Sequence, residues 1–408
     1  MVMTGLLHGI GHHHRRPLLT NWSLCRAPAD HTTGQHVQPD EVSWTPLREL
    51  MPVAAALREL KQWSLDGPAR RFDAEDWWYR LTFESLPASR HERIILGFDG
   101  LATLAQVWLN GKELLTSSNM FVSHEVDVSG ALNAAGNELL ICFSALDNQL
   151  AVKRKRPRWR APMIEHQQLR WFRTTLLGRT PGWSPPAAVV GPWKDIWLER
   201  RGPIDIANLS LTTRVEGTTG VALCTLPAQA PSAPSIESVH LKIVRGNHRS
   251  THPLTRRNNK DDLGTDQFSG ELRIDDVELW WPHTHGEPAL YAVSLQIRVA
   301  DAGEDITVDL GLVGFRTIAL DSSDGNFSVS VNGIPVFCRG ACWTPLDPVT
   351  LRASADDCRA AVAQARDAGM NMLRIAGTMV YEEEHFFNAC DELGMLVWQD
   401  LMFANMDY

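Results

Sequence analysis

The sequence predicts a multidomain protein in which two antiparallel β domains precede a unit of alternating strands and helices. Three observations predict this architecture. Short runs of β-forming residues separated by turns continue to about residue 201, and a stretch with period-2 alternation follows them. From about residue 321 the pattern changes to strand, helix, strand, helix, strand. A chain of 408 residues is long enough for two or three average domains.

The first domain is expected over residues 44–201. Its strand candidates are residues 77–83 (WWYRLTF), 93–98 (RIILGF), 105–109 (AQVWL) and 138–143 (ELLICF). Aromatic and β-branched residues of this kind favour strands. Asn110-Gly111 lies between two of these runs and is a strong signal for a two-residue hairpin. Short strands at this spacing predict an antiparallel sandwich or jelly roll.

The second domain is expected over residues 202–320. Apolar residues alternate with others at Tyr291, Val293, Leu295, Ile297 and Val299, which is the pattern of a strand with one buried face. The strand candidates are 204–215, 238–244, 267–274, 289–299 and 306–312, and the segments 227–234 and 256–266 are rich in turn residues. A stretch of this size and pattern predicts an immunoglobulin-like sandwich.

The third unit is expected over residues 321–408. Its predicted elements are a hairpin at Asn332-Gly333, a strand over 336–339, a helix over 355–368, a strand over 372–376, a helix over 383–393 and a strand over 395–401. Ser354 followed by Asp357 matches a capping box at the first helix start, and Gly369 and Gly394 stand where helices end. This order predicts parallel strands with right-handed crossovers.

Composition narrows the possible functions. The formal net charge of −9 argues against a nucleic-acid or polybasic membrane surface. No apolar run approaches the roughly 20 residues that span a bilayer. No spacing of Cys and His forms a metal-site motif, and no metal or cofactor is expected. Residues 1–17 carry their basic residues after a weak apolar stretch, the reverse order of a secretory signal, which favours a cytoplasmic protein, and residues 1–43 are predicted to be a disordered leader.

Chemistry-bearing residues gather at the ends of the predicted parallel strands, where functional groups collect in barrels and doubly wound sheets. Asp400 follows the third strand, Trp343 follows the first, and Arg374 lies within the second. An arginine in an apolar strand requires a carboxylate or polar partner if it is buried. A purely structural ion pair is the alternative interpretation. The acids at 382–384 are interpreted as residues of a helix's first turn, which the macrodipole favours.

The segment 153–179 carries nine basic residues against the single acid Glu165. Basic and aromatic residues together are typical of single-strand nucleic-acid binding, but the overall acidity counts against it. We instead expect a long loop whose arginines pair with carboxylates of a neighbouring domain. No motif supports a serine hydrolase, a nucleoside triphosphatase, a zinc protease or a dinucleotide-binding enzyme.

Several strings resemble, in the right order, those of family 2 glycoside hydrolases of the β-mannosidase-like branch. They are DWWYR at 76–80, ILGFDGLATLAQVWLNG at 95–111, LRWFRTTLLGRTPGWSP at 169–185, GPWKDIWL at 191–198, WWPHTHGEPALY at 280–291, VNGIPVFCRGACWTPLD at 331–347, GMNMLRIAGTMVYE at 369–382 and ELGMLVWQDLMFA at 392–404. The resemblance implies a sugar-binding jelly roll, an immunoglobulin-like sandwich and the first three βα units of an incomplete TIM barrel.

The resemblance also implies retaining hydrolysis of an exo-β-glycoside by two carboxyl groups. In the family both catalytic glutamates follow later barrel strands, so they are expected beyond Tyr408 and no residue of this chain is assigned as catalytic. The chain is therefore expected to be inactive alone, with a β-mannoside or related β-glycoside as the family's substrate. A non-catalytic carbohydrate-binding protein and an incomplete gene product remain alternatives.

Part of the substrate-binding shell carries over by resemblance. Trp343 would pack against the sugar, Arg374 would orient the catalytic carboxylates, and Asp400 would line the pocket floor. Two departures concern the sugar's identity. Ser184 stands near the position of an aspartate in the family's WDWGP string, and Ala376 begins the stretch that is usually Trp-Gly-Gly. Trp183 either stacks on sugar or anchors its loop to the core.

Overall fold

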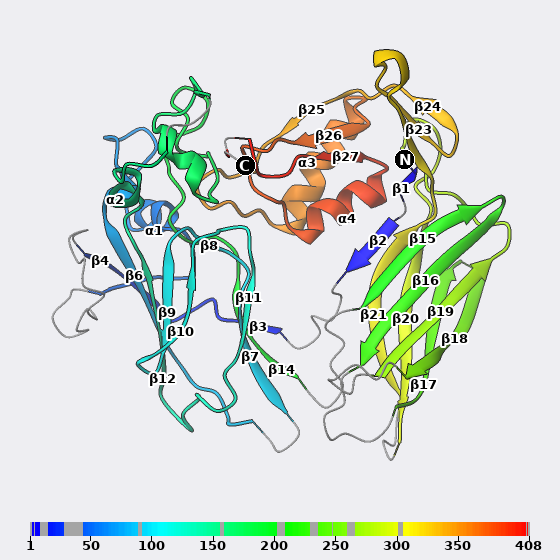
Figure 1. The fold of residues 1–408 in the computed structure, drawn as a ribbon, viewed down its shortest axis with the longest axis horizontal. Coiled ribbons are helices and arrows are strands. Elements are labelled where there is room, and N and C mark those ends of the chain that lie inside the picture. Colours follow the sequence, from blue (N-terminus) through cyan, green and yellow to red (C-terminus); the bar gives the residue numbers. More distant parts are fainter. Residues whose placement is uncertain are drawn as a thin grey trace.

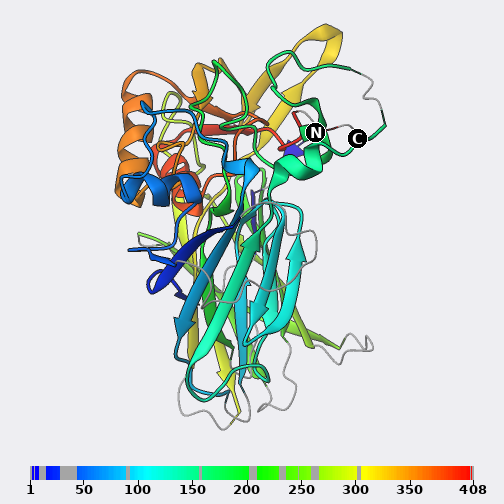
Figure 2. The same ribbon diagram turned by 90° about the vertical axis from the view of Figure 1, so that its left-hand side faces the viewer.

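Two antiparallel β sandwiches stand side by side, and a smaller unit of parallel strands and helices lies across one end of both (Figure 1). The view turned by 90° places this third unit at the same end (Figure 2). The computed structural model describes residues 2–3, 5–8, 15–27, 44–88, 92–155, 159–201, 209–228, 236–246, 248–258, 266–300, 305–404 and 406.

The first sandwich is built from a six-stranded and a four-stranded antiparallel sheet. The larger sheet has the order β10-β9-β12-β6-β4-β5, the smaller β11-β7-β14-β3, and β13 pairs with β8 beside them. The strands are β3 (Arg15–Pro17), β4 (Trp22–Ala27), β5 (Thr45–Pro46), β6 (Asp76–Phe83), β7 (Arg93–Phe98), β8 (Leu101–Ala102), β9 (Ala105–Leu109), β10 (Lys112–Ser117), β11 (His124–Asp127), β12 (Asn137–Phe143), β13 (Gly191–Pro192) and β14 (Ile196–Arg201). The predicted hairpin at Asn110-Gly111 is confirmed, since Lys112 pairs with Leu109.

The prediction of a disordered leader is wrong for residues 15–27. β4 pairs with β6 along its whole length, and β3 pairs with β14. Trp22, Leu24 and Ala27 of β4 are buried in this region of the sandwich, and the Trp22 indole N–H donates to the Leu18 carbonyl at 2.6 Å. The short β1 (Val2–Met3) and β2 (Gly5–His8) also pair, with β22 and β15 respectively. Apolar residues on both faces of β4 are buried, Trp22 and Leu24 in one cluster and Cys25 and Ala27 in another, and this burial recruits the strand into the fold.

The second sandwich consists of strands in the order β2-β15-β16-β19-β18-β17-β20-β21. They are β15 (Ser210–Glu216), β16 (Thr219–Ala228), β17 (Ile236–Arg245), β18 (His248–Asn258), β19 (Asp266–Ile274), β20 (Leu290–Val299) and β21 (Ile306–Gly314). The alternating residues Tyr291, Val293, Leu295, Ile297 and Val299 all lie in its core, as predicted. Strands β16 and β18 extend into the segments expected to be turns, because their neighbours pair with them up to Ala228 and Asn258.

The third unit contains a three-stranded parallel sheet in the order β25-β26-β27. Its elements are β25 (Gly340–Trp343), α3 (Ala355–Asp367), β26 (Met372–Ile375), α4 (Glu384–Leu393) and β27 (Leu396–Gln399). The predicted start of α3 is confirmed, since the Ser354 hydroxyl accepts the Asp357 N–H at 3.1 Å. Gly394 ends α4 in the left-handed conformation, with φ 67°.

The first parallel strand does not lie at 336–339 as predicted. The Asn332-Gly333 turn instead joins β23 (Ser328–Val331) to β24 (Ile334–Val336) in an antiparallel sheet with β22 (Ile318–Asp321), and β25 begins four residues after β24. The remaining short helices are α1 (Val53–Glu59), α2 (Leu146–Leu150), η2 (Phe72–Ala74), η3 (Gln167–Trp171) and η4 (Ser323–Gly325).

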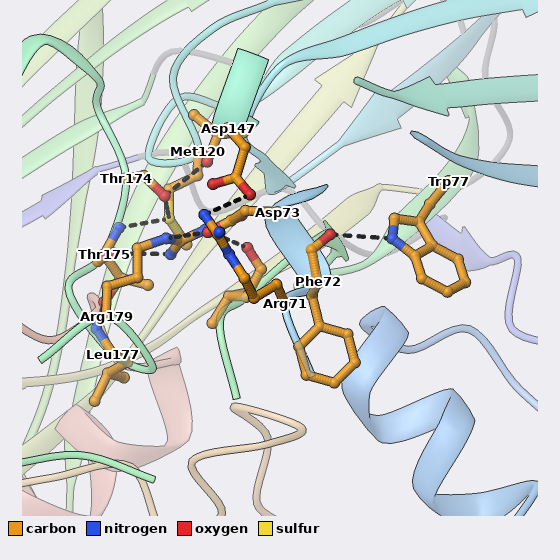
Figure 3. A network of polar contacts seen from close by, with 12 residues as sticks. Arg71, Phe72, Asp73, Trp77, Met120, Asp147, Thr174, Thr175, Leu177 and Arg179 are labelled. Atoms are coloured by element: carbon orange, nitrogen blue, oxygen red, sulfur yellow. Dashed lines mark hydrogen bonds and ion pairs between the residues drawn. The ribbon is translucent and has the colours of Figure 1, made fainter. Parts of the chain in front are cut away.

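A buried ion pair fixes the loop that follows η3. Arg179 donates from Nε and Nη2 to the two carboxylate oxygens of Asp73, both at 2.8 Å, and the two side chains are only 5% and 12% exposed (Figure 3). The same guanidinium donates to the carbonyls of Thr175 and Val189. A bidentate pair with its remaining donors satisfied holds both ends of this loop against η2.

The loop held in this way also touches the third unit. Thr175 Oγ1 donates to the carbonyl of Met379 at 2.8 Å, and the Leu176 N–H donates to the carbonyl of Thr378. Arg173 donates to the carbonyl of Met402 at 2.6 Å. The expectation that this basic segment pairs with carboxylates of a neighbouring domain is wrong for Arg173 and Arg179. Arg173 donates to the Met402 carbonyl of the third unit, and Arg179 pairs with Asp73 of its own sandwich.

The second sandwich meets the third unit through the loop before β20. The Trp280 indole N–H donates to the Asp391 carbonyl at 2.8 Å, and the His283 N–H donates to the Gly394 carbonyl at 3.0 Å. A Cβ on Gly394 would lie 2.6 Å from the His283 nitrogen, so glycine is required there for close approach as well as for its positive φ.

Asp73→Asn should destabilise the first sandwich by about 3–5 kcal/mol, because it leaves the Arg179 charge buried without its counter-ion. The matched control is Arg71→Ala, which removes the neighbouring pair with Asp147, in which Arg71 is 76% exposed (Figure 3). We expect that control to cost less than about 1 kcal/mol. Calorimetric unfolding of the three proteins measures both effects, and equal losses for the two variants would contradict the assignment.

Candidate functional site

One face of the parallel sheet is covered by helices and the other is open. Trp343, Leu373 and Ile375 pack with side chains of α3 and α4 in a single core cluster. On the opposite face Cys342, Arg374 and Trp398 are register neighbours from the three strands, and all three are exposed. The open face therefore presents a row of polar and aromatic side chains close to the carboxyl ends of the strands, where α/β proteins place their sites.

Arg374 and Asp400 form a two-point ion pair on this open face. Arg374 donates from Nη2 to Asp400 Oδ2 at 2.7 Å and from Nε to Oδ1 at 3.3 Å, and the Gly377 N–H donates to Oδ2 at 3.2 Å. The Arg374 guanidinium also lies 5.7 Å from the centroid of the Trp398 ring. A carboxylate partner was expected for Arg374 if it were buried; the side chain is exposed, yet it pairs with Asp400. Its role towards a sugar stays a prediction.

The pair shifts the protonation equilibria of both groups. Burial by itself raises the pKa of Asp400, but the hydrogen bonds from Arg374 and Gly377 and the Arg374 charge outweigh burial and lower it below its ordinary value. The hydrogen bond to Asp400 and its charge raise the pKa of Arg374. Both groups are therefore charged at neutral pH, and the carboxylate retains acceptor capacity for a hydroxyl group.

Trp343 lies on the other side of the sheet from this pair. Its side chain is 8% exposed, its ring centroid lies 4.8 Å from that of Phe386 in α4, and its indole N–H donates to Glu382 Oε1 at 3.0 Å. The indole is thus part of the helix-covered core and shows little of its face to solvent. Packing of Trp343 against a sugar stays a prediction.

Glu382 does not lie in the first turn of α4, as predicted for the acids at 382–384, but accepts a hydrogen bond from Trp343. The N-cap of α4 is Glu383, without a side-chain cap, whereas Glu382 accepts from Trp343. Burial raises the pKa of Glu382, opposed by the Trp343 hydrogen bond and the charge of Lys194. Burial also lowers the pKa of Lys194, opposed by several acids including Glu382. Opposite charges from the first sandwich and the third unit therefore face each other across their interface.

An apolar cluster also lies at this interface. Trp193 donates its indole N–H to the Met120 carbonyl at 2.9 Å, and Phe121 makes edge contacts with both Trp193 and Tyr381. Residues of the two units share this cluster, including Leu177 from the loop and Val380 from the third unit. The interface combines burial with hydrogen bonds, which favours a fixed arrangement of loop and sheet.

Trp183 stands apart from these groups on the surface. Its side chain is 74% exposed, so the alternative that it anchors the loop to the core is wrong. Ser184 is occupied within the loop, where its hydroxyl accepts the Gly178 N–H at 2.9 Å and lies 2.9 Å from Thr180 Oγ1. The structure therefore brings Arg374 and Asp400 together and places Trp343 and Trp183 elsewhere.

Three residues of this region were not singled out from the sequence. Asp73 and Lys194 make their contacts across long stretches of sequence, and Glu382 was assigned to the helix start. For Lys194 the available signal was a Lys-Asp pair within the otherwise apolar stretch GPWKDIWL, since a charge that becomes buried requires a partner. Among the described residues, no group of three or more His, Cys, Asp or Glu side chains could hold a metal ion. No helix in the described part of the chain is long and apolar enough to cross a bilayer.

Comparison with known proteins agrees with this architecture. Residues 64–194 match the family described as glycosyl hydrolase 2 galactose-binding domain-like. Beta-mannosidase B of Aspergillus oryzae is 30% identical over 355 residues, which are 83% of this chain and 40% of that protein. Beta-mannosidase B of Aspergillus flavus is 31% identical over 361 residues with the same shares. The chain is related to the family 2 glycoside hydrolases and matches the N-terminal portion of their β-mannosidase-like members.

Solved structures share the fold over nearly the whole chain. The β-D-mannosidase of Dictyoglomus thermophilum matches with a TM-score of 0.72 and 23% identity over 95% of this chain and 47% of its own. The exo-chitosanase of Amycolatopsis orientalis matches with a TM-score of 0.65 and 20% identity over 94% and 43%. The chain thus spans about 40% of the length of the curated family members that it matches. The multidomain, β-rich family 2 fold predicted from the sequence is confirmed.

Asp400→Asn should lower stability by less than about 1 kcal/mol at neutral pH, because the side chain of Arg374 is nearly half exposed and solvent screens the pair. A lowered pKa means that the contribution of Asp400 is present above its unfolded-state pKa of about 4 and is lost as pH falls through the folded value. The wild-type advantage should therefore disappear in acid. Unfolding midpoints of both proteins at neutral pH and near pH 3 measure this, and an advantage of constant size would contradict it.

Proposed function

We propose that this chain supplies the N-terminal β domains and one wall of the sugar pocket of a retaining exo-β-glycosidase of the β-mannosidase type. The observation that carries the proposal is the Arg374–Asp400 pair, which lies on the open face of a parallel sheet in a chain 30% identical to β-mannosidase B over 83% of its length. Charged groups with free acceptor capacity at strand carboxyl ends suit recognition of sugar hydroxyls.

In this proposal β25, β26 and β27 are the first strands of a (β/α)8 barrel whose helices α3 and α4 lie outside. The support is the parallel order of adjacent strands and the position of both helices on one face, so that Cys342, Arg374 and Trp398 face the interior of the barrel. The first domain extends to residue 201 and includes β3 and β4, the sandwich occupies 202–320, and the barrel begins at 321.

The proposal assigns different roles to Asp400 and Arg374. Asp400 accepts hydrogen bonds from the sugar while Arg374 holds it ionised and orients neighbouring carboxylates. Two further carboxyl groups, one as acid and one as nucleophile, perform retaining hydrolysis. We assign neither role to Asp400, because its ion pair with Arg374 keeps it ionised and holds it in a fixed position, where it accepts hydrogen bonds from the sugar. The proposed partner is a β-mannoside or related β-glycoside, and the cytoplasmic location stays a prediction.

The identity of the sugar is left open by two positions. Ser184 is bonded within its own loop, and Ala376 precedes the Gly377 that contacts Asp400. Neither provides the carboxylate or aromatic wall that the mannosidase pattern has there. The related folds come from a mannosidase and an exo-chitosanase, which act on different sugars.

The purified 408-residue chain should show no turnover of nitrophenyl β-mannoside, β-galactoside or β-glucuronide, because the proposal assigns the acid and the nucleophile to none of its residues. It should still bind methyl β-mannoside or a related methyl β-glycoside weakly, in the millimolar range, and Asp400→Asn should weaken that binding. A chromogenic assay and calorimetric titration measure the two properties.

Turnover by the pure chain that disappears in Asp400→Asn would contradict the assignment of catalysis to other residues. A flat titration at millimolar concentration for every methyl glycoside would contradict the sugar pocket itself. Arg71→Ala is the matched control, because it removes an exposed charge of the first sandwich far along the chain from Asp400. It should leave the titration unchanged.

A further inference from the structure

Arg173 reaches from the loop of the first sandwich to the chain that follows β27. Its Nη1 donates to the Met402 carbonyl at 2.6 Å, and its guanidinium lies 4.1 Å from the centroid of the Phe403 ring. The centroid of Phe121, a residue of the first sandwich, lies 5.5 Å from the same guanidinium. A charged donor that also contacts two aromatic rings has little freedom to leave the carbonyl that it binds.

The first sandwich holds the backbone of Arg173 in place. The Met120 N–H donates to the Arg173 carbonyl at 3.0 Å, and Asn119 forms an isolated parallel bridge with Arg173. Asn119 Oδ1 also accepts the Phe121 N–H at 3.0 Å, which fixes the ring beside the guanidinium. The position of the guanidinium is therefore set by the first sandwich and not by the third unit.

Met402 is held at both of its polar backbone groups. Its carbonyl accepts from Arg173, and its N–H donates to Tyr381 Oη at 3.2 Å. Its side chain is 2% exposed and packs in the core cluster that α3 and α4 share. One residue after β27 is thus fixed by a side chain of the first sandwich, by a side chain of the third unit and by burial.

Asp400 lies two positions before Met402, at the point where the parallel sheet ends. Its N–H donates to the Ile375 carbonyl at 3.0 Å, which is its link to the neighbouring strand β26. A Cβ on Gly377 would lie 2.6 Å from the Leu401 carbonyl oxygen, so this turn packs directly against the residue whose N–H binds the Asp400 carboxylate. A displacement of Met402 therefore changes the distances that the Asp400 carboxylate makes.

We propose that Arg173 is a positioning residue of the sugar pocket: it sets the place of the Asp400 carboxylate through the backbone of Met402, without touching the sugar itself. The reference to a sugar rests on the proposed function. The affinity of a pocket in the third unit then depends on a side chain of the first sandwich. Tyr381, which holds the same residue from the other side, acts in the same direction.

The test uses the full chain with isotope labels at the carboxyl carbons of aspartate, and NMR measures the titration of Asp400 and the binding of methyl β-mannoside. In Arg173→Ala the pKa of Asp400 should rise towards its ordinary value of about 4, because the hydrogen bonds from Arg374 and Gly377 that lower it become longer. Binding should weaken about tenfold, the scale of one charged hydrogen bond. Arg173→Lys should recover most of both properties, since a lysine N–H can still reach the carbonyl.

Tyr381→Phe separates position from charge. It removes the acceptor of the Met402 N–H and changes no charge, so any rise in the pKa of Asp400 comes from a shift of the backbone. We expect a change in the same direction as in Arg173→Ala, but smaller. If Arg173→Ala does not fold, a raised pKa of Asp400 in Tyr381→Phe supports the proposal and an unchanged one overturns it.

Arg154→Ala is the matched control. Arg154 also donates to a carbonyl, that of Gln149 at 2.7 Å, and its guanidinium lies 4.8 Å from the centroid of the Phe172 ring. Both of these contacts lie within the first sandwich and its loop. The control should leave the Asp400 titration and the binding of methyl β-mannoside as in the wild type.

The outcomes separate the positioning role from the proposed function. If Arg173→Ala unfolds at a lower temperature but Asp400 titrates as in the wild type, Arg173 is only a structural contact and the proposal is overturned. If the wild type binds no methyl glycoside while the pKa of Asp400 rises in Arg173→Ala and Tyr381→Phe, the proposed function is overturned and the positioning role stands.

Discussion

The buried ion pair between Asp73 and Arg179 is the constraint on which the arrangement of the site depends. Two fully paired charges with short bidentate hydrogen bonds fix the loop that follows η3 at the end of the first sandwich. From that loop Thr175 and Leu176 reach the backbone at Thr378 and Met379 in the third unit. Because a buried arginine without its counter-ion is strongly unfavourable, the loop has one stable position.

The loop of the first sandwich also fixes the position of the chain beside the open face of the parallel sheet. Arg374 and Asp400 lie on strands whose other face is covered by α3 and α4, while the segment just after β26 is held by the loop of the first sandwich. The charges of Lys194 and of Glu382 and Glu383 also influence one another's pKa across the same interface. The first sandwich thus sets the position of the backbone at Thr378 and Met379, which lies beside the candidate pocket.

Local patterns in the sequence predicted local structure well. The capping box at Ser354 and the glycine at 394 lie where the helices begin and end, and the alternation from Tyr291 to Val299 marks a core strand. Arg374 was expected to need a carboxylate or polar partner only if buried; it is exposed, and Asp400 pairs with it nevertheless. Each of these inferences depends on a rule that acts over a few residues or one unit.

Long-range contacts could not be predicted in the same way. Asp73 and Arg179 are 106 positions apart, and nothing near either residue indicates the other. Glu382 sits among acids that suit a helix start, yet its partner Trp343 belongs to another strand. Residues 15–27 were assigned to a leader, since short strands acquire their stability only from the sheets that they join. The exposure of Trp183 likewise depends on how a whole loop folds.

Hydrogen–deuterium exchange of Asp73→Asn tests most directly whether one ion pair holds the loop and the third unit together. The amides of residues 174–184 and those of residues 376–381 should lose protection in parallel, while Arg71→Ala leaves both segments as in the wild type. Loss of protection confined to the immediate neighbours of residues 73 and 179, with residues 376–381 unchanged, would contradict the account.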